Sequence, residues 1–122
     1  MADTLSKEQG RALLAKKPKR SKYGNVPTIV DGIRFASKKE ARRYVYLKAR
    51  ERAGEIGAFR RQPRYPLVVN GLHVATYIGD FDYIDAIANR YVTEDVKGVK
   101  TPKFILKAKL FHALYGREVS IV

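Results

Sequence analysis

The sequence predicts one α/β (α+β) domain in which helices flank a mixed β-sheet. Two segments carry apolar residues at helical spacing, and the chain between them alternates as strands do, around turn dipeptides. With 122 residues, 45% of them hydrophobic, the chain can bury one core but not two. The expected order is helix, three or four antiparallel strands, helix and a final strand.

Residues 1–22 are predicted to form a basic, disordered tail, and residues 23–122 the folded domain. The tail holds seven Lys and Arg side chains and two acidic ones, with too few apolar groups to offset the entropy lost on ordering. Two interpretations of the tail stay open: an arm that contacts phosphates without sequence preference, or a soluble chain end.

Two dipeptides predict tight hairpins. Asp31-Gly32 and Asn70-Gly71 favour two-residue loops, because their residues tolerate positive φ angles. The strands that these dipeptides join are expected at Thr28–Val30, Ile33–Phe35, Tyr65–Val69 and Leu72–Tyr77.

Cap residues delimit the two helices. Ser37 and Glu40 have the spacing of a capping box, and Gly54 is a suitable end for the helix that they open. Thr101 precedes a proline, as the residue before a second helix often does, and Gly116 ends that helix.

Three further segments complete the expected sheet. Gly79 predicts a bend in front of the strand 80–85. The strand Tyr91–Lys97 follows, and Val119–Val122 forms the last strand. Because a helix separates these two strands, they are expected to run parallel.

The charge of the chain indicates a polyanionic partner. Lys and Arg number 25 against 12 Asp and Glu, a formal net charge of +13, and the isoelectric point is near 10.1. Nucleic acid is favoured over a membrane surface, because no basic helix with a strong apolar face dominates the sequence.

Since there is no cysteine, disulfides, thiol catalysis and cysteine-based zinc sites are excluded. No apolar run approaches the roughly 20 residues of a membrane span, and the N-terminus lacks an apolar signal core, so we expect a cytoplasmic protein without a membrane partner.

The segment Glu94–Gly98 contains the most informative pattern. On a strand, Asp95 and Lys97 project from the same face. If the preceding strand pairs with this one, Asp80 comes close to Asp95, and two such carboxylates repel each other unless a cation lies between them. Their hard oxygen atoms suit Mg²⁺, with Mn²⁺ as a substitute. A nearby lysine can stabilise the negative charge that develops during phosphodiester hydrolysis.

This arrangement resembles the PD-(D/E)XK nuclease superfamily. The resemblance implies a restriction-endonuclease-like core of helix–strand–strand–strand–helix–strand. It also implies that Asp80 is the first metal ligand, that Asp95-Val96-Lys97 is the D/E-x-K triplet, and that Glu40 is the glutamate which many members carry on the preceding helix. The chain departs from the pattern at Gly79, where the superfamily name has proline.

A closer resemblance covers nearly the whole chain from Tyr23 onward. The segments YGN, DGIRFASKKEARRY, Gln62-Pro63, YIGDFDY and EDVKG, followed by a lysine-rich last helix, are similar to a family of small phage and prophage nuclease-like proteins. This resemblance implies a hydrolase used in replication or recombination, and some relatives of the fold resolve branched DNA. Related nucleases often place a glutamine near the metal water, so Gln62 is included among the candidate catalytic residues.

Each candidate residue also has a structural interpretation. Glu40 can serve only as the capping partner of Ser37, and Asp80 can be a turn residue. Asp95 and Lys97 can form a surface ion pair, which contributes little by itself. Asp82 shares a face with Asp80 in the alternation, but it is expected to be a solvated strand residue.

Basic side chains near these acids are candidates for contact with the DNA backbone, although each can equally belong to a solvated face. They lie on or beside the two helices: Arg42, Arg43, Lys100, Lys103 and Lys107.

The leading hypothesis is a Mg²⁺-dependent DNA endonuclease, acting on branched or otherwise structured DNA. The alternative is a non-catalytic DNA-binding protein on the same fold, and an RNA-binding role is weaker because the aromatic motif of an RNA-binding sheet is missing. Cutting two strands requires two sites, so a homodimer is expected if that is the activity.

Overall fold

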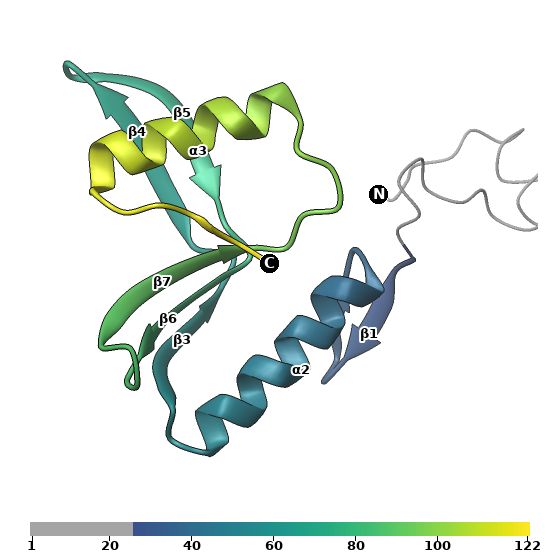
Figure 1. Ribbon diagram of the computed structural model, residues 1–122. Coiled ribbons are helices and arrows are strands. Elements are labelled where there is room, and N and C mark those ends of the chain that lie inside the picture. The colour runs from purple at the N-terminus through teal and green to yellow at the C-terminus, as the bar shows by residue number, and fades with distance from the viewer. Residues whose placement is uncertain (1–25) are drawn as a thin grey trace, which may run out of the picture.

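The computed structural model describes residues 26–122, so the predicted tail 1–22 lies outside the described residues. Within this range the chain is a mixed α+β structure with eight strands and two helices (Figure 1). In chain order the elements are β1 (Thr28–Val30), β2 (Ile33–Phe35), α2 (Lys38–Arg52), β3 (Ile56–Arg61), β4 (Arg64–Val69), β5 (Leu72–Ile78), β6 (Phe81–Asp85), β7 (Arg90–Asp95), α3 (Pro102–Tyr115) and β8 (Ser120–Ile121).

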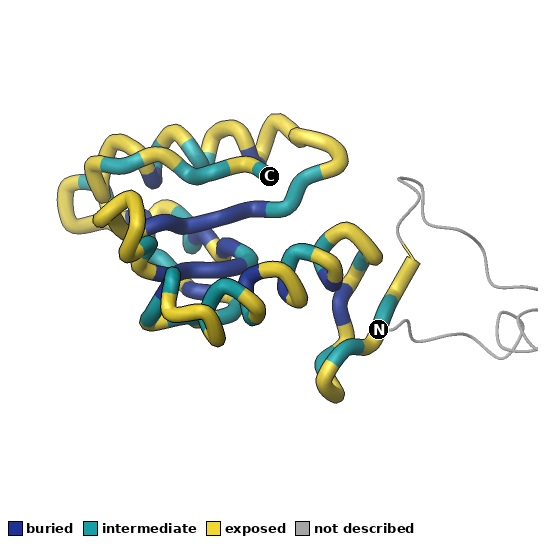
Figure 2. Tube along the Cα trace, turned by 60° about the horizontal axis from the view of Figure 1, so that its bottom comes forward, coloured by how far each residue is buried: buried dark blue, intermediate teal, exposed yellow. Residues whose placement is uncertain are grey.

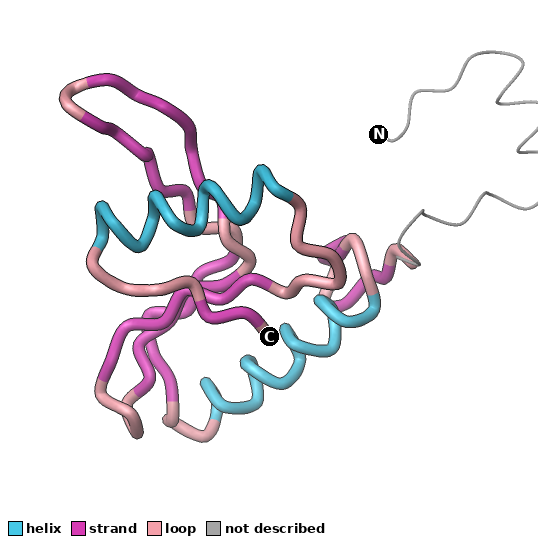
Figure 3. The backbone as a smooth tube through the Cα atoms, turned by 45° about the horizontal axis from the view of Figure 1, so that its top comes forward, coloured by secondary structure: helices cyan, strands magenta, loops and turns pink. Residues whose placement is uncertain are grey.

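The central sheet has the strand order β3-β6-β7-β8. Strand β6 runs antiparallel to β3 and β7, whereas β8 lies parallel to β7, so the sheet is mixed as predicted. The chain passes through α3 between β7 and β8, and this crossover gives the expected parallel pair. Figure 3 shows that the two remaining hairpins, β1–β2 and β4–β5, stand apart from this sheet.

Both hairpin predictions are confirmed. Asp31 and Gly32 have φ angles of 52° and 75°, and Asn70 and Gly71 have 50° and 80°. Positive φ at both central residues is the requirement of a two-residue turn whose twist matches that of the strands. Strand β3 was not predicted from the sequence, and it pairs with β6 through a register shift between Gly57 and Arg60.

The helix caps are also confirmed. The Ser37 hydroxyl accepts a hydrogen bond from the Glu40 N–H at 3.1 Å, and the Thr101 hydroxyl accepts one from the Phe104 N–H at 3.1 Å. Gly116 follows α3 with a φ angle of 76°, which suits a helix C-cap. No helix among residues 26–122 is long and apolar enough to cross a membrane.

Two apolar clusters hold the layers together. The first lies between α2 and the central sheet, and it contains Phe35, Ala41, Tyr44, Leu47, Ile56, Phe81, Tyr83 and Val92. The second lies between α3 and the β4–β5 hairpin, and it contains Leu67, Tyr77, Phe104 and Phe111. The central strands are therefore the most buried part of the chain, while both helices present an exposed outer face (Figure 2).

Candidate active site

Three acidic residues lie near one end of the central sheet, and each comes from a different element. Glu40 lies in the first turn of α2, Asp80 in the bend between β5 and β6, and Asp95 at the end of β7. The bend is fixed by its backbone, because the Asp80 N–H donates to the Glu94 carbonyl at 2.9 Å. The Asp80 carboxylate in turn accepts from the Val96 N–H at 2.7 Å.

The backbone of this bend suits glycine at position 79. Its N–H donates to the Pro63 carbonyl at 3.0 Å, a bond that proline could not make. A Cβ at this position would lie 3.2 Å from Thr93 Cγ2 and 3.4 Å from the Glu94 carbonyl oxygen. Glycine therefore lets the backbone before Asp80 pass close to β7.

The electrostatics of the cluster favour a cation or a proton. Burial raises the pKa of Asp80 to about 7; the negative charges of Asp95 and Glu40 add to this, and the hydrogen bond from the Val96 N–H opposes it. Burial also raises the pKa of Glu40, against the opposing charge of Arg61. The Glu40 and Asp80 carboxyl groups are therefore destabilised in their charged forms, and a bound cation would relieve this.

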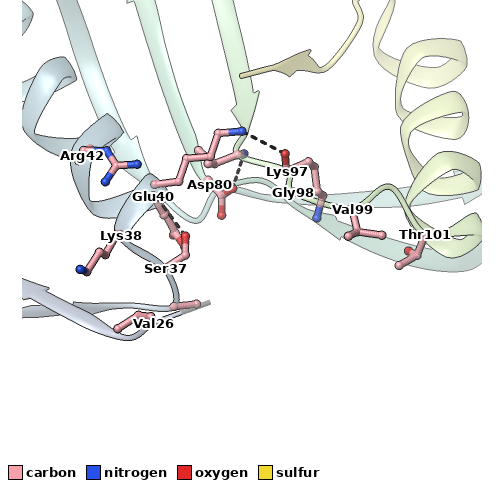
Figure 4. Close-up of a pocket in the computed structure, with 13 residues that line it drawn as sticks. Val26, Ser37, Lys38, Glu40, Arg42, Asp80, Lys97, Gly98, Val99 and Thr101 are labelled. Atoms are coloured by element: carbon pink, nitrogen blue, oxygen red, sulfur yellow. Dashed lines mark hydrogen bonds between the residues drawn. The ribbon is translucent and has the colours of Figure 1, made fainter. Parts of the chain in front are cut away.

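A cleft of about 520 Å³ opens in front of Glu40 and Asp80. Figure 4 shows these two side chains beside each other, with Lys97 next to Asp80 and with Val99 and Thr101 farther along the cleft. The lining is basic around the two carboxyl groups and includes Lys38, Lys39 and Arg42. The Lys39 ammonium donates to the Lys97 carbonyl at 3.2 Å, which ties α2 to the chain after β7.

Asp95 and Lys97 lie together as predicted, although β7 ends at Asp95 and Lys97 follows it in the loop rather than on the predicted strand. The Lys97 Nζ is 3.2 Å from Asp95 Oδ1 and 4.4 Å from the centroid of the Phe104 ring. The Lys97 ammonium therefore lies against α3. A second cleft of about 260 Å³ lies there, lined by Asp95, Lys97, Lys103 and Lys107 among others. Lys97 lines both clefts, so the predicted site residues are distributed over two adjoining spaces.

Other predicted residues take varied positions. Gln62 is exposed with a φ angle of 50°, and it contacts the site through its backbone, since its N–H donates to the Asp80 carbonyl at 2.9 Å. Arg42 is exposed at the first cleft, whereas Lys100 lines neither of the two clefts. Arg43 donates two hydrogen bonds to the buried Glu94 carboxylate, at 2.8 and 2.5 Å. These bonds hold α2 against β7, so Arg43 has a structural role.

The expectation for Asp82 was wrong, because its side chain is fully buried rather than solvated. It accepts hydrogen bonds from Arg60 at 2.5 Å, from Thr93 at 2.6 Å and from the Tyr65 hydroxyl. Asp82 thus faces the β4–β5 hairpin, while Asp80 bonds to the backbone beyond β7. The bend at Gly79 separates their environments.

Arg61 was missed in the sequence although it lies near the site. Its charge is the largest opposing influence on the pKa of Glu40, and its guanidinium stacks over the Phe35 ring at 5.0 Å. Its Nε is buried without a hydrogen-bond partner in the described structure. The only signal in the sequence was its place directly before Gln62.

The chemistry of these side chains fits Mg²⁺, although they do not form a ready-made cage. Among residues 26–122 no three acidic or histidine side chains converge as a metal-binding group. Mg²⁺ is usually held by one or two carboxylates together with water and substrate phosphates, rather than by protein ligands alone. Asp80 and its acidic neighbours supply oxygen ligands of that kind beside an open cleft.

A family model described as "Protein of unknown function (DUF1064)" matches residues 20–121. The chain belongs to this family. The match covers the whole described fold up to Ile121 and so includes every element that contributes to the two clefts. No curated protein and no solved structure matched the chain.

Proposed function

We propose that this DUF1064 chain is a Mg²⁺-dependent DNA endonuclease with a PD-(D/E)XK core. One observation carries the proposal: Glu40, Asp80 and Asp95 come from three separate elements, yet they line two adjoining clefts that also hold basic side chains, Glu40 and Asp80 the first and Asp95 the second. Carboxylates repel DNA unless a cation covers them, so their place in a basic cleft favours catalysis over simple binding.

The candidate residues would have separate roles in hydrolysis. Asp80, Asp95 and Glu40 would hold Mg²⁺, which supplies a Lewis acid and lowers the pKa of water. In the reaction the oxygen of one water bonds to phosphorus, one P–O ester bond breaks, and the leaving oxygen takes up a proton. A carboxylate of the cluster can accept the proton released by the water, and the Lys97 ammonium can stabilise the added charge on the phosphoryl oxygens.

The net charge of +13 supports a DNA partner, because neutralising phosphates releases counterions. Lys38, Lys39 and Arg42 would contact the backbone on one side of the scissile phosphate, and Lys103 and Lys107 on the other. Branched or structured DNA, as formed in phage replication and recombination, is the proposed substrate. Cutting both strands would require two copies of the chain.

A non-catalytic DNA-binding protein is the second candidate, and one observation favours it. The Lys97 ammonium packs on the Phe104 ring, and Asp95 lines the second cleft but not the first, so the three carboxyl groups and the lysine do not face a single space. A nuclease of this kind would have to turn the Lys97 side chain when DNA binds. This is a small change for a flexible lysine.

A cleavage assay separates the two candidates. The purified chain is incubated with supercoiled plasmid, a four-way junction and a flap substrate, in Mg²⁺, in Mn²⁺ and in EDTA. We expect cleavage with either ion and none in EDTA. Asp95→Asn should abolish cleavage while DNA affinity holds or rises, whereas Glu118→Gln, which removes one charge at an exposed residue, should cut normally. If no substrate is cut but all are bound, the non-catalytic candidate is correct.

A further inference from the structure

Two tyrosines of the β4–β5 hairpin reach the central sheet, although no strand of the hairpin pairs with that sheet. The Tyr77 hydroxyl donates to Asp95 Oδ2 at 2.6 Å, and the Tyr65 hydroxyl donates to Asp82. Tyr65 and Tyr77 lie directly opposite each other in the hairpin register. They therefore form a pair across the hairpin, in which only Tyr77 contacts an acid of the candidate site.

The Tyr77 bond restricts how Asp95 can turn. Both residues are 2% exposed, and the Tyr77 ring packs against Phe111 with centroids 5.4 Å apart. With Oδ2 held by this hydroxyl, the other oxygen, Oδ1, is the one that faces Lys97 at 3.2 Å. Asp95 and Lys97 both line the second cleft, so Oδ1 is the oxygen left for a cation.

We propose that Tyr77 is a positioning residue of the site, whose hydroxyl orients Asp95 so that Oδ1 can bind a divalent cation. This inference rests on the proposed function, because it assigns Asp95 to a metal. Groups that hydrogen-bond to metal ligands fix the direction of the ligand atoms, and their loss lowers metal affinity. Tyr77 thus links the hairpin to the proposed metal centre.

The Tyr65 bond is the internal control. Its acceptor, Asp82, is fully buried and also bonds to Arg60 and Thr93 at 2.5 and 2.6 Å. Asp82 lines neither of the two clefts, so removing the Tyr65 hydroxyl should disturb packing and hydrogen bonding without reaching the metal.

The test compares Tyr77→Phe with Tyr65→Phe in the full chain without DNA. Mn²⁺ binding is measured by calorimetry at pH 7.5, and urea unfolding in EDTA is measured on the same samples. We expect Tyr77→Phe to raise the Kd for Mn²⁺ by about 10- to 100-fold, and Tyr65→Phe to leave it within about twofold of wild type. The unfolding midpoints of the two variants should fall by similar amounts, so that lost stability does not explain the difference.

A double variant makes the inference independent of how well Tyr77→Phe folds. If Tyr77 acts through Asp95, adding Tyr77→Phe to Asp95→Asn should not weaken Mn²⁺ binding further. Equal Kd values for the two single tyrosine variants, or a further loss in the double variant, would overturn the positioning role and leave the proposed metal site intact. If wild type binds Mn²⁺ no better than Asp80→Asn does, the proposed function fails and the inference fails with it.

Discussion

Replacing Asp80 by asparagine should stabilise the metal-free protein, and more strongly as the pH rises. The pKa of Asp80 is raised from its ordinary value of 3.8 to about 7, first by burial and then by its acidic neighbours. Between these two pH values the folded chain keeps a proton that the unfolded chain has lost. The free energy of unfolding of wild type therefore falls as the pH rises through this window.

The size of the effect follows from the linkage of one proton to folding. A group with a raised folded pKa contributes stability that is complete below its unfolded pKa and is lost as the pH passes through its folded pKa. One such proton changes the free energy of unfolding by at most about 1.4 kcal/mol per pH unit. Because asparagine does not titrate, the advantage of Asp80→Asn over wild type should grow from pH 5 to pH 7 and then level off.

The assay is urea unfolding followed by circular dichroism at pH 5, 6, 7 and 8 in EDTA, for wild type, Asp80→Asn and the exposed-site control Glu118→Gln. Saturating Mg²⁺ at pH 8 should then reverse the order, because a ligand that binds only the folded wild type stabilises it. If the stability difference between Asp80→Asn and wild type is constant, or shrinks as the pH rises, the pKa of Asp80 is not raised in the folded protein.

Two further substitutions have matched neighbours as controls. Lys97→Ala should lower the single-turnover cleavage rate at saturating enzyme by about 100-fold or more, as expected for the loss of one transition-state donor. The control, Lys100→Ala, should cut at nearly the wild-type rate. Equal cleavage rates for the two variants would show that Lys97 takes no part in the chemical step. Arg43→Ala should lower the free energy of unfolding in urea by about 3–5 kcal/mol, because it leaves the buried Glu94 unpaired. Arg42→Ala, at an exposed residue, should change it by less than about 0.5 kcal/mol, and similar losses for the two variants would contradict the structural role of Arg43.

Local signals in the sequence predicted most of the fold. A two-residue hairpin turn needs positive φ at both of its central residues. The dipeptides Asp31-Gly32 and Asn70-Gly71 tolerate these angles and adopt them in the structure. Ser37 and Thr101 cap helices through their own hydroxyl groups, which is a contact within four residues. Such features are visible in sequence because the atoms that interact are also neighbours along the chain.

Strand β3 was missed because its signal is weak. Ile56–Arg61 has the sequence IGAFRR, which mixes glycine, alanine and two arginines and alternates poorly. Its place in the sheet comes from pairing with β6, some 25 residues further on. Tertiary pairing overrides strand propensity in such segments, and no local rule reports it.

The environment of the acidic residues could be predicted only in part. Alternation correctly set Glu94 and Asp95 on opposite faces, because a strand has a fixed period of two. Lys97 also meets Asp95 as predicted, but from the loop after β7, which ends at Asp95. It could not show that Asp82 is buried, since that depends on Tyr65, which reaches it from another sheet, and on Arg60 of the neighbouring strand. Nor could it show that the Lys97 ammonium packs on Phe104, because a lysine on a flexible stem can turn to either cleft.

The end of β7 connects both layers of the molecule, and this decides where a site can form. Glu94 faces α2 and is held by Arg43, whereas the next residue, Asp95, faces the β4–β5 hairpin and is held by Tyr77. The backbone carbonyl of Glu94 also fixes the bend that carries Asp80. Side chains that approach from α2 and from the hairpin can therefore meet only where β7 ends and the sheet no longer separates the two layers. The candidate carboxyl groups lie at that point, so their relative positions depend on the packing of α2, of the hairpin and of β7 together rather than on any one segment.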